Sequence, residues 1–188
     1  MAVATLDNVP KKTRDLFQKA VSAMERENLD YAIEMFTDIL ELEPKLLEAR
    51  KLLRAAEIRK FREKKTSQLT HAIASLTGMG GIMSVNKNLR KKPHKAVVAA
   101  EALLRKDPLN KTFLEAHAKA ASAADLPEAA IDSLELAADA YPNDVKVLQL
   151  LADTYDDVGM TTEAKESYEK IVMLRPSDPT ALKKMKDA

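Results

Sequence analysis

The chain has 188 residues, of which 46% are apolar and 31% are charged, and its formal net charge at pH 7 is +1. It contains no cysteine, which excludes disulfides, thiolate metal sites and cysteine nucleophiles. Four glycines and this length agree with one soluble, all-helical domain. The first residues lack a basic segment followed by an apolar one, so no cleaved secretion signal is indicated and a cytoplasmic protein is expected.

Prolines recur along the chain with a fixed period. Pro108, Pro142 and Pro176 stand 34 residues apart, and the residue twelve positions before each of them is alanine. A fourth copy upstream has Ala32 before Pro44. A period of this size predicts a helical solenoid, in which units of two helices stack because no unit can bury its apolar face alone.

In chain order, the period divides the sequence into four units and a short end segment. The units are expected at residues 13–46, 47–110, 111–144 and 145–178. Residues 179–188 are expected to form a cap helix or the start of a fifth unit. The second unit is 30 residues too long, so we predict that an insert at about 66–90 separates its two helices, at 47–64 and 93–106.

The insert departs most clearly from the repeat. Residues 66–85 carry no formal charge and hold three of the four glycines, Gly78, Gly80 and Gly81. Only nine of these twenty residues are apolar, which argues against a membrane span, and a bare loop would leave large apolar side chains uncovered. The favoured interpretation is a helix at about 67–77, a glycine corner at 78–81 and a short helix at about 82–89, covering either the solenoid or a partner.

The fourth unit has the most complete pattern of side chains. Its characteristic residues are Leu148, Leu151, Ala152, Tyr155, Gly159, Ala164 and Tyr168. These are the positions and residue types of the tetratricopeptide repeat family, which the chain resembles. The resemblance implies an all-α, right-handed helical solenoid of helix-turn-helix repeats, with an insertion in the second repeat. It also implies a scaffold or adaptor that binds a peptide or partner segment in the concave groove of the repeats.

The resemblance places this groove on the first helix of each unit. The expected groove residues are Arg14, Phe17 and Val21 in the first unit, Glu115 and Lys119 in the third, and Lys146, Gln149, Asp153, Asp156 and Asp157 in the fourth. The acidic side chains of this set favour a basic or amphipathic partner segment. The chaperone-binding members of the family hold a terminal carboxylate with a lysine and asparagine clamp. Val21, Lys119 and Asp153 stand where the asparagine would be, which argues against that ligand.

Charge is divided between the two parts of the chain. Residues 1–106 carry 21 Lys and Arg against 13 Asp and Glu, whereas residues 107–188 carry 9 against 16. Basic side chains frame the insert: Arg59, Lys60, Arg62, Lys64 and Lys65 precede it, and Lys87, Arg90, Lys91 and Lys92 follow it. They are either solvated helix ends or a basic patch, so binding of nucleic acid or an anionic membrane surface is the alternative function. An aromatic content of 4% argues against base stacking.

The charge division predicts a monomer or a weak, salt-dependent homodimer.

No pattern for catalysis or cofactor binding is present in the sequence. The histidines are His71, His94 and His117, and none has a second ligand at helical spacing that would define a metal site. His117 stands where the family usually has leucine, so we interpret it as a packed core residue. We therefore expect a protein that is not an enzyme and uses no cofactor or metal.

Overall fold

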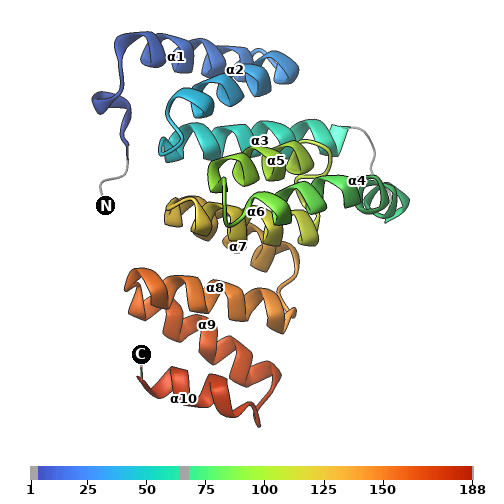
Figure 1. Ribbon diagram of the computed structural model, residues 1–188, viewed down its shortest axis with the longest axis vertical. Helices are drawn as coiled ribbons and strands as arrows, with labels where there is room; N and C mark the ends of the chain where they lie inside the picture. Colours follow the sequence, from blue (N-terminus) through green and yellow to red (C-terminus); the bar gives the residue numbers. More distant parts are fainter. Residues whose placement is uncertain (1–3, 64–67, 188) are drawn as a thin grey trace.

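The computed structural model describes residues 4–63 and 68–187 as a row of stacked helices (Figure 1). The α-helices are α1 (Lys11–Glu25), α2 (Leu29–Leu42), α3 (Leu47–Glu63), α4 (Gln68–Asn88), α5 (Pro93–Leu104), α6 (Lys111–Ala123), α7 (Pro127–Ala140), α8 (Val145–Val158), α9 (Thr161–Leu174) and α10 (Pro179–Asp187), preceded by a short 3-10 helix at Leu6–Asn8. Within the two described ranges the chain forms no named strand. The predicted all-α repeat solenoid is confirmed.

Turns at equivalent positions of the repeat are built in the same way. Glu27, Asp125 and Gly159 each stand seventeen residues before the closing proline of their unit, and their φ angles are 62°, 61° and 80°. This left-handed conformation ends the first helix of a unit, and it favours glycine, which only the fourth unit has. The first helices also begin alike. Asn110, Asp144 and Asp178 recur every 34 residues, and each side-chain oxygen accepts a backbone N–H bond in the first turn that follows.

The helices enclose two separate hydrophobic cores. The first core lies within α1, α2 and α3 and contains Phe36 and Leu53. The second runs from α4 to α10 and contains Phe113, Leu148 and Tyr168. We call the two groups of helices the first stack and the second stack. Figure 1 shows α3 at the boundary between them, above α5 and α6.

The structure corrects the predicted organisation of the second unit. α4 is one continuous helix from Gln68 to Asn88, with no corner at residues 78–81. α5 packs along α4 on one side and along α6 on the other, whereas α3 packs on α2. The hairpin partner of α5 is therefore the helix of the insert, and α3 closes the first stack.

In the part of the chain that the structure describes, no helix combines the length and hydropathy needed to span a bilayer.

Two glycines explain why α4 does not break at its centre. A Cβ atom on Gly78 would lie 2.4 Å from Cζ of Phe113, and one on Gly81 would lie 2.5 Å from Cδ2 of Leu103. Glycine at these positions lets the α4 backbone approach α5 and α6 closely. The packing that results offsets the low helix propensity of glycine.

This packing predicts opposite effects for two neighbouring substitutions. We expect Gly78→Ala to lower the free energy of unfolding by about 1–3 kcal/mol, because the added methyl group overlaps the buried Phe113 ring. Gly80→Ala should raise it by about 0.5–1 kcal/mol, because a Cβ there meets nothing within 4 Å and alanine favours the helix. Urea denaturation followed by circular dichroism measures both values. Equal stability of the two variants would contradict the close packing of α4.

Candidate functional site

A groove crosses the second stack between α6 and α8, with the turn after α4 at its edge. Its volume is about 350 Å³ and its floor is apolar, with Ala118, Leu134 and Leu150. The complete lining is Leu89, Arg90, Glu115, Ala118, Lys119, Ser122, Ala123, Leu134, Leu150 and Thr154. The groove thus brings together two predicted groove residues, Glu115 and Lys119, with Arg90 from the predicted basic patch.

Two acidic side chains that the sequence assigned to the groove, Glu115 and Asp153, already have partners within the chain. Glu115 is buried and accepts a bond from Nζ of Lys146 at 2.6 Å. Asp153 accepts bonds from Nε2 of Gln149 at 3.0 Å and from the Tyr168 hydroxyl at 2.8 Å. Burial and this bond to Asp153 raise the pKa of Tyr168 to about 12, so the hydroxyl remains a donor at neutral pH. These carboxylates are therefore occupied in structural contacts.

The C-terminal helix neutralises another predicted groove residue. Nζ of Lys184 on α10 lies 2.5 Å from Oδ2 of Asp156, and the bond to Asp156 raises the pKa of Lys184. The side chain of Asp157 is exposed, and no ion pair joins it to a residue that the structure describes. The acidic surface predicted for the fourth unit is therefore reduced mainly to Asp157.

Two cations at the groove are exposed. Arg90 lies in the turn after α4, and Lys119 lies on α6. Neither forms an ion pair with a residue that the structure describes. Exposed cations beside an apolar floor attract carboxylates and add selectivity more than affinity. The groove can thus accept an apolar side chain next to negative charge.

The predicted groove residues of the first unit lie elsewhere. Phe17 is only 8% exposed and packs edge to face on Phe36, with ring centroids 5.8 Å apart, so it belongs to the first core. Its assignment to an open groove is wrong, because burial against Phe36 leaves little of its surface for a ligand. Nη1 of Arg14 donates to the backbone oxygen of Asp7 at 3.0 Å, and Val21 is half-buried against the first core.

The predicted basic patch is divided between paired and exposed side chains. Nη2 of Arg59 lies 2.6 Å from Oε1 of Glu27, and Lys60 forms an ion pair with Asp30. Lys64 and Lys65 lie outside the described residues. The members that are exposed, and that have no ion pair with any described residue, are Arg62, Lys87, Arg90, Lys91 and Lys92. The positive charge left for a partner is thus concentrated around the end of α4.

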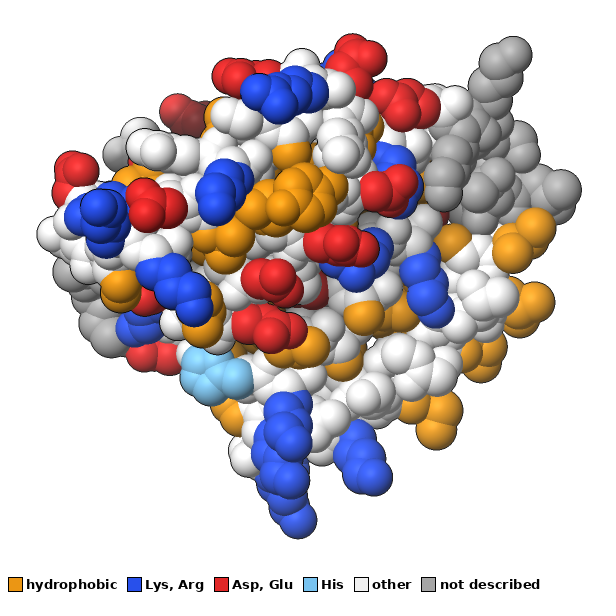
Figure 2. Space-filling view, turned by 90° about the horizontal axis from the view of Figure 1, so that it is seen from above, with side chains coloured by type: hydrophobic (Ala, Val, Ile, Leu, Met, Phe, Trp, Pro, Cys, Tyr) orange, Lys and Arg blue, Asp and Glu red, His pale blue; other side chains and the backbone are white. Residues whose placement is uncertain are grey.

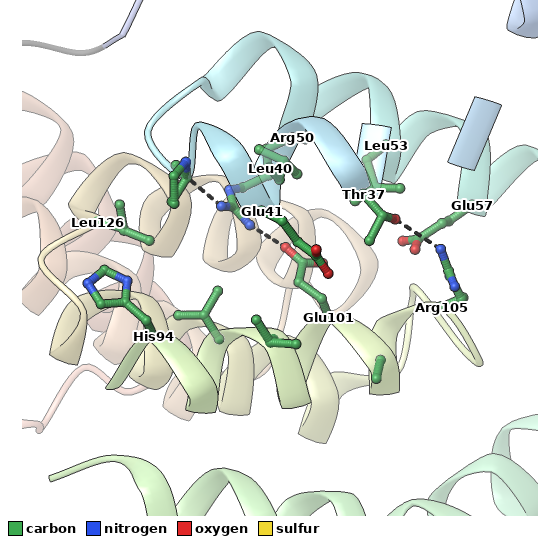
Figure 3. A pocket seen from close by; sticks show the side chains of 14 residues that line it. Thr37, Leu40, Glu41, Arg50, Leu53, Glu57, His94, Glu101, Arg105 and Leu126 are labelled. Carbon is green, nitrogen blue, oxygen red and sulfur yellow. Dashed lines mark hydrogen bonds and ion pairs between the residues drawn. The ribbon is translucent and has the colours of Figure 1, made fainter. Parts of the chain in front are cut away.

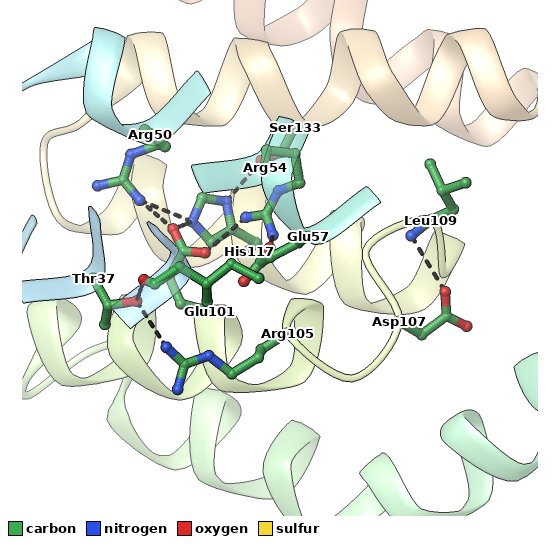
Figure 4. Close-up of polar contacts among 11 residues, drawn as sticks. Thr37, Arg50, Arg54, Glu57, Glu101, Arg105, Asp107, Leu109, His117 and Ser133 are labelled. Atoms are coloured by element: carbon green, nitrogen blue, oxygen red, sulfur yellow. Dashed lines mark hydrogen bonds and ion pairs between the residues drawn. The ribbon is translucent and has the colours of Figure 1, made fainter. Parts of the chain in front are cut away.

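A buried polar network joins the two stacks, and the sequence did not predict it (Figure 4). Glu101 of α5 accepts bonds from Arg50 and from Nη2 of Arg54 on α3, the latter at 2.7 Å. Nε2 of His117 lies 2.9 Å from Oε1 of Glu101, and its Nδ1 lies 2.7 Å from Oγ of Ser133. The interpretation of His117 as a core residue is confirmed, since its side chain is completely buried.

Burial changes the ionisation of this network. It raises the pKa of Glu57, which is paired with Arg54, to about 7. Burial also lowers the pKa of His117, so its imidazole is neutral at neutral pH. Burial would raise the pKa of Glu101 as well, but the hydrogen bond from His117 and the charges of Arg54 and Arg50 outweigh that effect and hold it well below the usual range. Glu101 is therefore the ionised centre of the network.

A second concavity lies between α2, α3 and α5, at the junction of the stacks (Figure 3). Its volume is about 620 Å³ and its walls include Leu40, Leu53 and Val97. Nη2 of Arg105 donates to Oγ1 of Thr37 at 2.9 Å, so these two polar groups at the edge of the concavity are hydrogen-bonded to each other. Among the described residues, no three His, Asp or Glu side chains come together as ligands for a metal ion.

Comparisons with known proteins agree with this architecture. The sequence pattern described as tetratricopeptide repeat matches residues 145–178, and no curated protein sequence matches the chain. Three solved structures share the fold, each with a TM-score of 0.50. The first TPR of Spaghetti (RPAP3), bound to the HSP90 peptide SRMEEVD, is 18% identical and covers 65% of this chain and 92% of its own. The Sgt2 TPR domain from Aspergillus fumigatus is 25% identical and covers 57% and 74%. A thermophilic TPR protein from Thermus thermophilus, TTC0263, is 14% identical and covers 93% and 97%. Residues 145–178 thus carry the tetratricopeptide repeat pattern, and the chain shares the fold of solved TPR structures.

Proposed function

We propose that the protein is a non-enzymatic scaffold or adaptor that binds a segment of a partner protein in the groove between α6 and α8. The observation that carries this proposal is an apolar floor beside two exposed cations, Arg90 and Lys119. The acidic side chains nearby are mostly paired within the chain. The segment that suits such a groove has an apolar side chain next to carboxylates, whereas the sequence favoured a basic or amphipathic segment.

The fold supports a role of this kind. One solved structure of the same fold holds the peptide SRMEEVD, which contains an apolar residue beside two glutamates. In the groove described above, burial of one large apolar side chain would contribute about 1.5–3 kcal/mol. Each exposed ion pair would add about 0.2–1 kcal/mol. Apolar contact thus provides most of the affinity, and Arg90 and Lys119 provide the preference for acidic segments.

Selection from a random peptide library displayed on phage tests this function. We expect the wild-type chain to enrich peptides in which Leu, Ile, Met or Phe stands beside Glu or Asp. These peptides should bind at least about tenfold more weakly to Leu150→Gln and to the double variant Arg90→Glu, Lys119→Glu. The matched control is Lys165→Glu, Lys170→Glu, which changes two exposed lysines of α9 and should bind as the wild type does.

The outcomes separate this proposal from the alternatives. Enrichment of Lys-rich or Arg-rich peptides, or selected peptides that bind all variants equally, would contradict the groove assignment. Nucleic acid is the less favoured partner, because Arg59 and Lys60 are paired with acidic side chains and the chain has few aromatic residues for base stacking. A gel shift with single-stranded DNA that depends on Lys91 and Lys92 would overturn that choice.

A further inference from the structure

α4 is apolar on two opposite faces. One face packs into the second core through Ala74, Gly78 and Val85. The other face presents Ile73, Leu76, Met79 and Met83, whose exposed fractions are 54%, 72%, 61% and 71%. We call these four residues the apolar stripe of α4. Their spacing of three and four residues puts them in a line along the helix.

The apolar stripe is unusual for this surface. The other large apolar side chains that are exposed in the described part of the chain are spread over α2, α5, α8 and α9, whereas these four lie within eleven residues of one helix. A contiguous patch of large exposed apolar side chains on a protein surface marks an interaction site. Figure 2 shows apolar side chains along the right edge of the molecule, the side on which α4 begins in Figure 1. Gly80 lies on the same face, and nothing lies within 4 Å of its Cβ position.

Positive charge frames the apolar stripe. From Gln68 to Asn86 α4 carries no formal charge. Lys87, Lys91 and Lys92 follow it, and their side chains are exposed without an ion pair to any residue the structure describes. The exposed Arg62 stands six residues before the start of α4. Apolar contact in the middle and cations at the ends are complementary to an amphipathic segment that carries carboxylates.

The charges and residue types discriminate among three occupants. A second copy of the chain, paired through α4 in either direction, would bring basic ends against basic ends. Helices that lie in a membrane surface carry a polar face rich in Lys and Arg, whereas α4 has no charged residue from Gln68 to Asn86. Methionine side chains such as Met79 and Met83 adapt well to the irregular surface of a partner helix. An acidic amphipathic helix fits all of these features.

We propose that the apolar stripe of α4 is a second docking surface, which binds an acidic amphipathic helix of a partner protein. The partner helix lays apolar side chains at i, i+3, i+4 and i+7 along Ile73, Leu76 and Met83, and its carboxylates face Lys87, Lys91 and Lys92. This surface is separate from the groove between α6 and α8. A scaffold with both surfaces can hold two partners at once.

A synthetic helix tests this surface directly. The probe is a fluorescein-labelled peptide of about five helical turns, with Leu at i, i+3, i+4 and i+7 spacing and Glu at the other surface positions. Fluorescence anisotropy should show saturable binding to the full chain. The same peptide in scrambled order, and the version with Lys in place of Glu, should bind at least about tenfold more weakly. Binding of all three peptides with equal affinity would overturn the proposal.

Matched variants locate the binding. Leu76→Gln and Met83→Gln should each weaken the Glu peptide by about tenfold or more, whereas Met173→Gln, at a methionine of α9 that is 79% exposed, should not. Lys91→Glu, Lys92→Glu should weaken it, and Lys165→Glu, Lys170→Glu should not. Equal binding by wild type and Met83→Gln overturns the proposal. So does a dimer in sedimentation velocity, or pelleting with phosphatidylserine vesicles, that Met83→Gln abolishes. If Leu150→Gln is the only variant that loses binding of the Glu peptide, the peptide binds in the groove between α6 and α8, and the proposal of a second surface is overturned.

Discussion

Replacing Glu101 by alanine is expected to lower the free energy of unfolding by about 3–5 kcal/mol. The reason is that Arg50 and Arg54, which are 3% and 5% exposed, would remain buried without their shared carboxylate. His117 would also lose a bond of 2.9 Å. Urea denaturation followed by circular dichroism measures the change.

The same substitution is expected to change the shape of the transition. The polar network and the concavity between α2, α3 and α5 lie between the two hydrophobic cores. Loss of Glu101 therefore weakens the contact that couples the stacks. Repeat proteins lose cooperativity when an interface between neighbouring units is weakened. In hydrogen exchange, the amides of α1 to α3 and those of α4 to α10 should then lose protection at different urea concentrations.

A surface ion pair provides the control for Glu101. Arg59 and Glu27 are paired on the surface, with side chains that are 42% and 73% exposed. Arg59→Ala should therefore change stability by no more than about 1 kcal/mol and leave the transition unchanged. If Glu101→Ala is no less stable than Arg59→Ala, the network does not hold the stacks together.

The parts of this structure that the sequence predicted are those with local signals. Pro93 and Pro127 begin α5 and α7 at the first helical position, because proline has no N–H to lose there. The ranges predicted for the third and fourth units each contain two helices, and the turn between these helices lies at the same repeat position in both units. Glu115 and Lys119, which their repeat positions assign to a binding groove, both line the concavity between α6 and α8, and their role in binding stays a prediction.

The parts that the sequence did not predict depend on contacts between distant residues. The glycines of α4 signalled a corner, and only the positions of Phe113 and Leu103 show that they permit close packing. Glu101 and Arg50 are 51 residues apart, so no local sequence pattern indicates their ion pair. A histidine at a leucine position was the one sequence signal of the network. The pairing of acidic groove residues, such as Asp156 with Lys184 of α10, likewise follows from the stacking of helices.

Glu57 is expected to make stability depend on pH. Its folded pKa of about 7 is above its ordinary value of 4.5, since burial favours the protonated carboxyl. The stability that this group contributes is therefore complete below about pH 4.5 and is lost as the pH rises through 7. The charged groups around it are Arg54, Glu101 and Arg105. Ionisation of Glu57 should remove about 2–3 kcal/mol of unfolding free energy over this range.

The difference between the wild type and Glu57→Gln isolates this effect. His117 and Glu101 have lowered pKa values, so their contributions to stability are lost as the pH falls, which is the opposite direction. Because the wild type and Glu57→Gln both contain His117 and Glu101, these contributions cancel in the difference. The unfolding free energy of Glu57→Gln minus that of the wild type should rise by about 2–3 kcal/mol between pH 5 and pH 8, measured by urea denaturation at each pH. Glu48→Gln, which changes an exposed carboxylate on the same helix, controls for the loss of one negative charge. A difference that stays constant from pH 5 to pH 8 would mean that Glu57 is ionised throughout, and the buried carboxyl would then be fully compensated by Arg54.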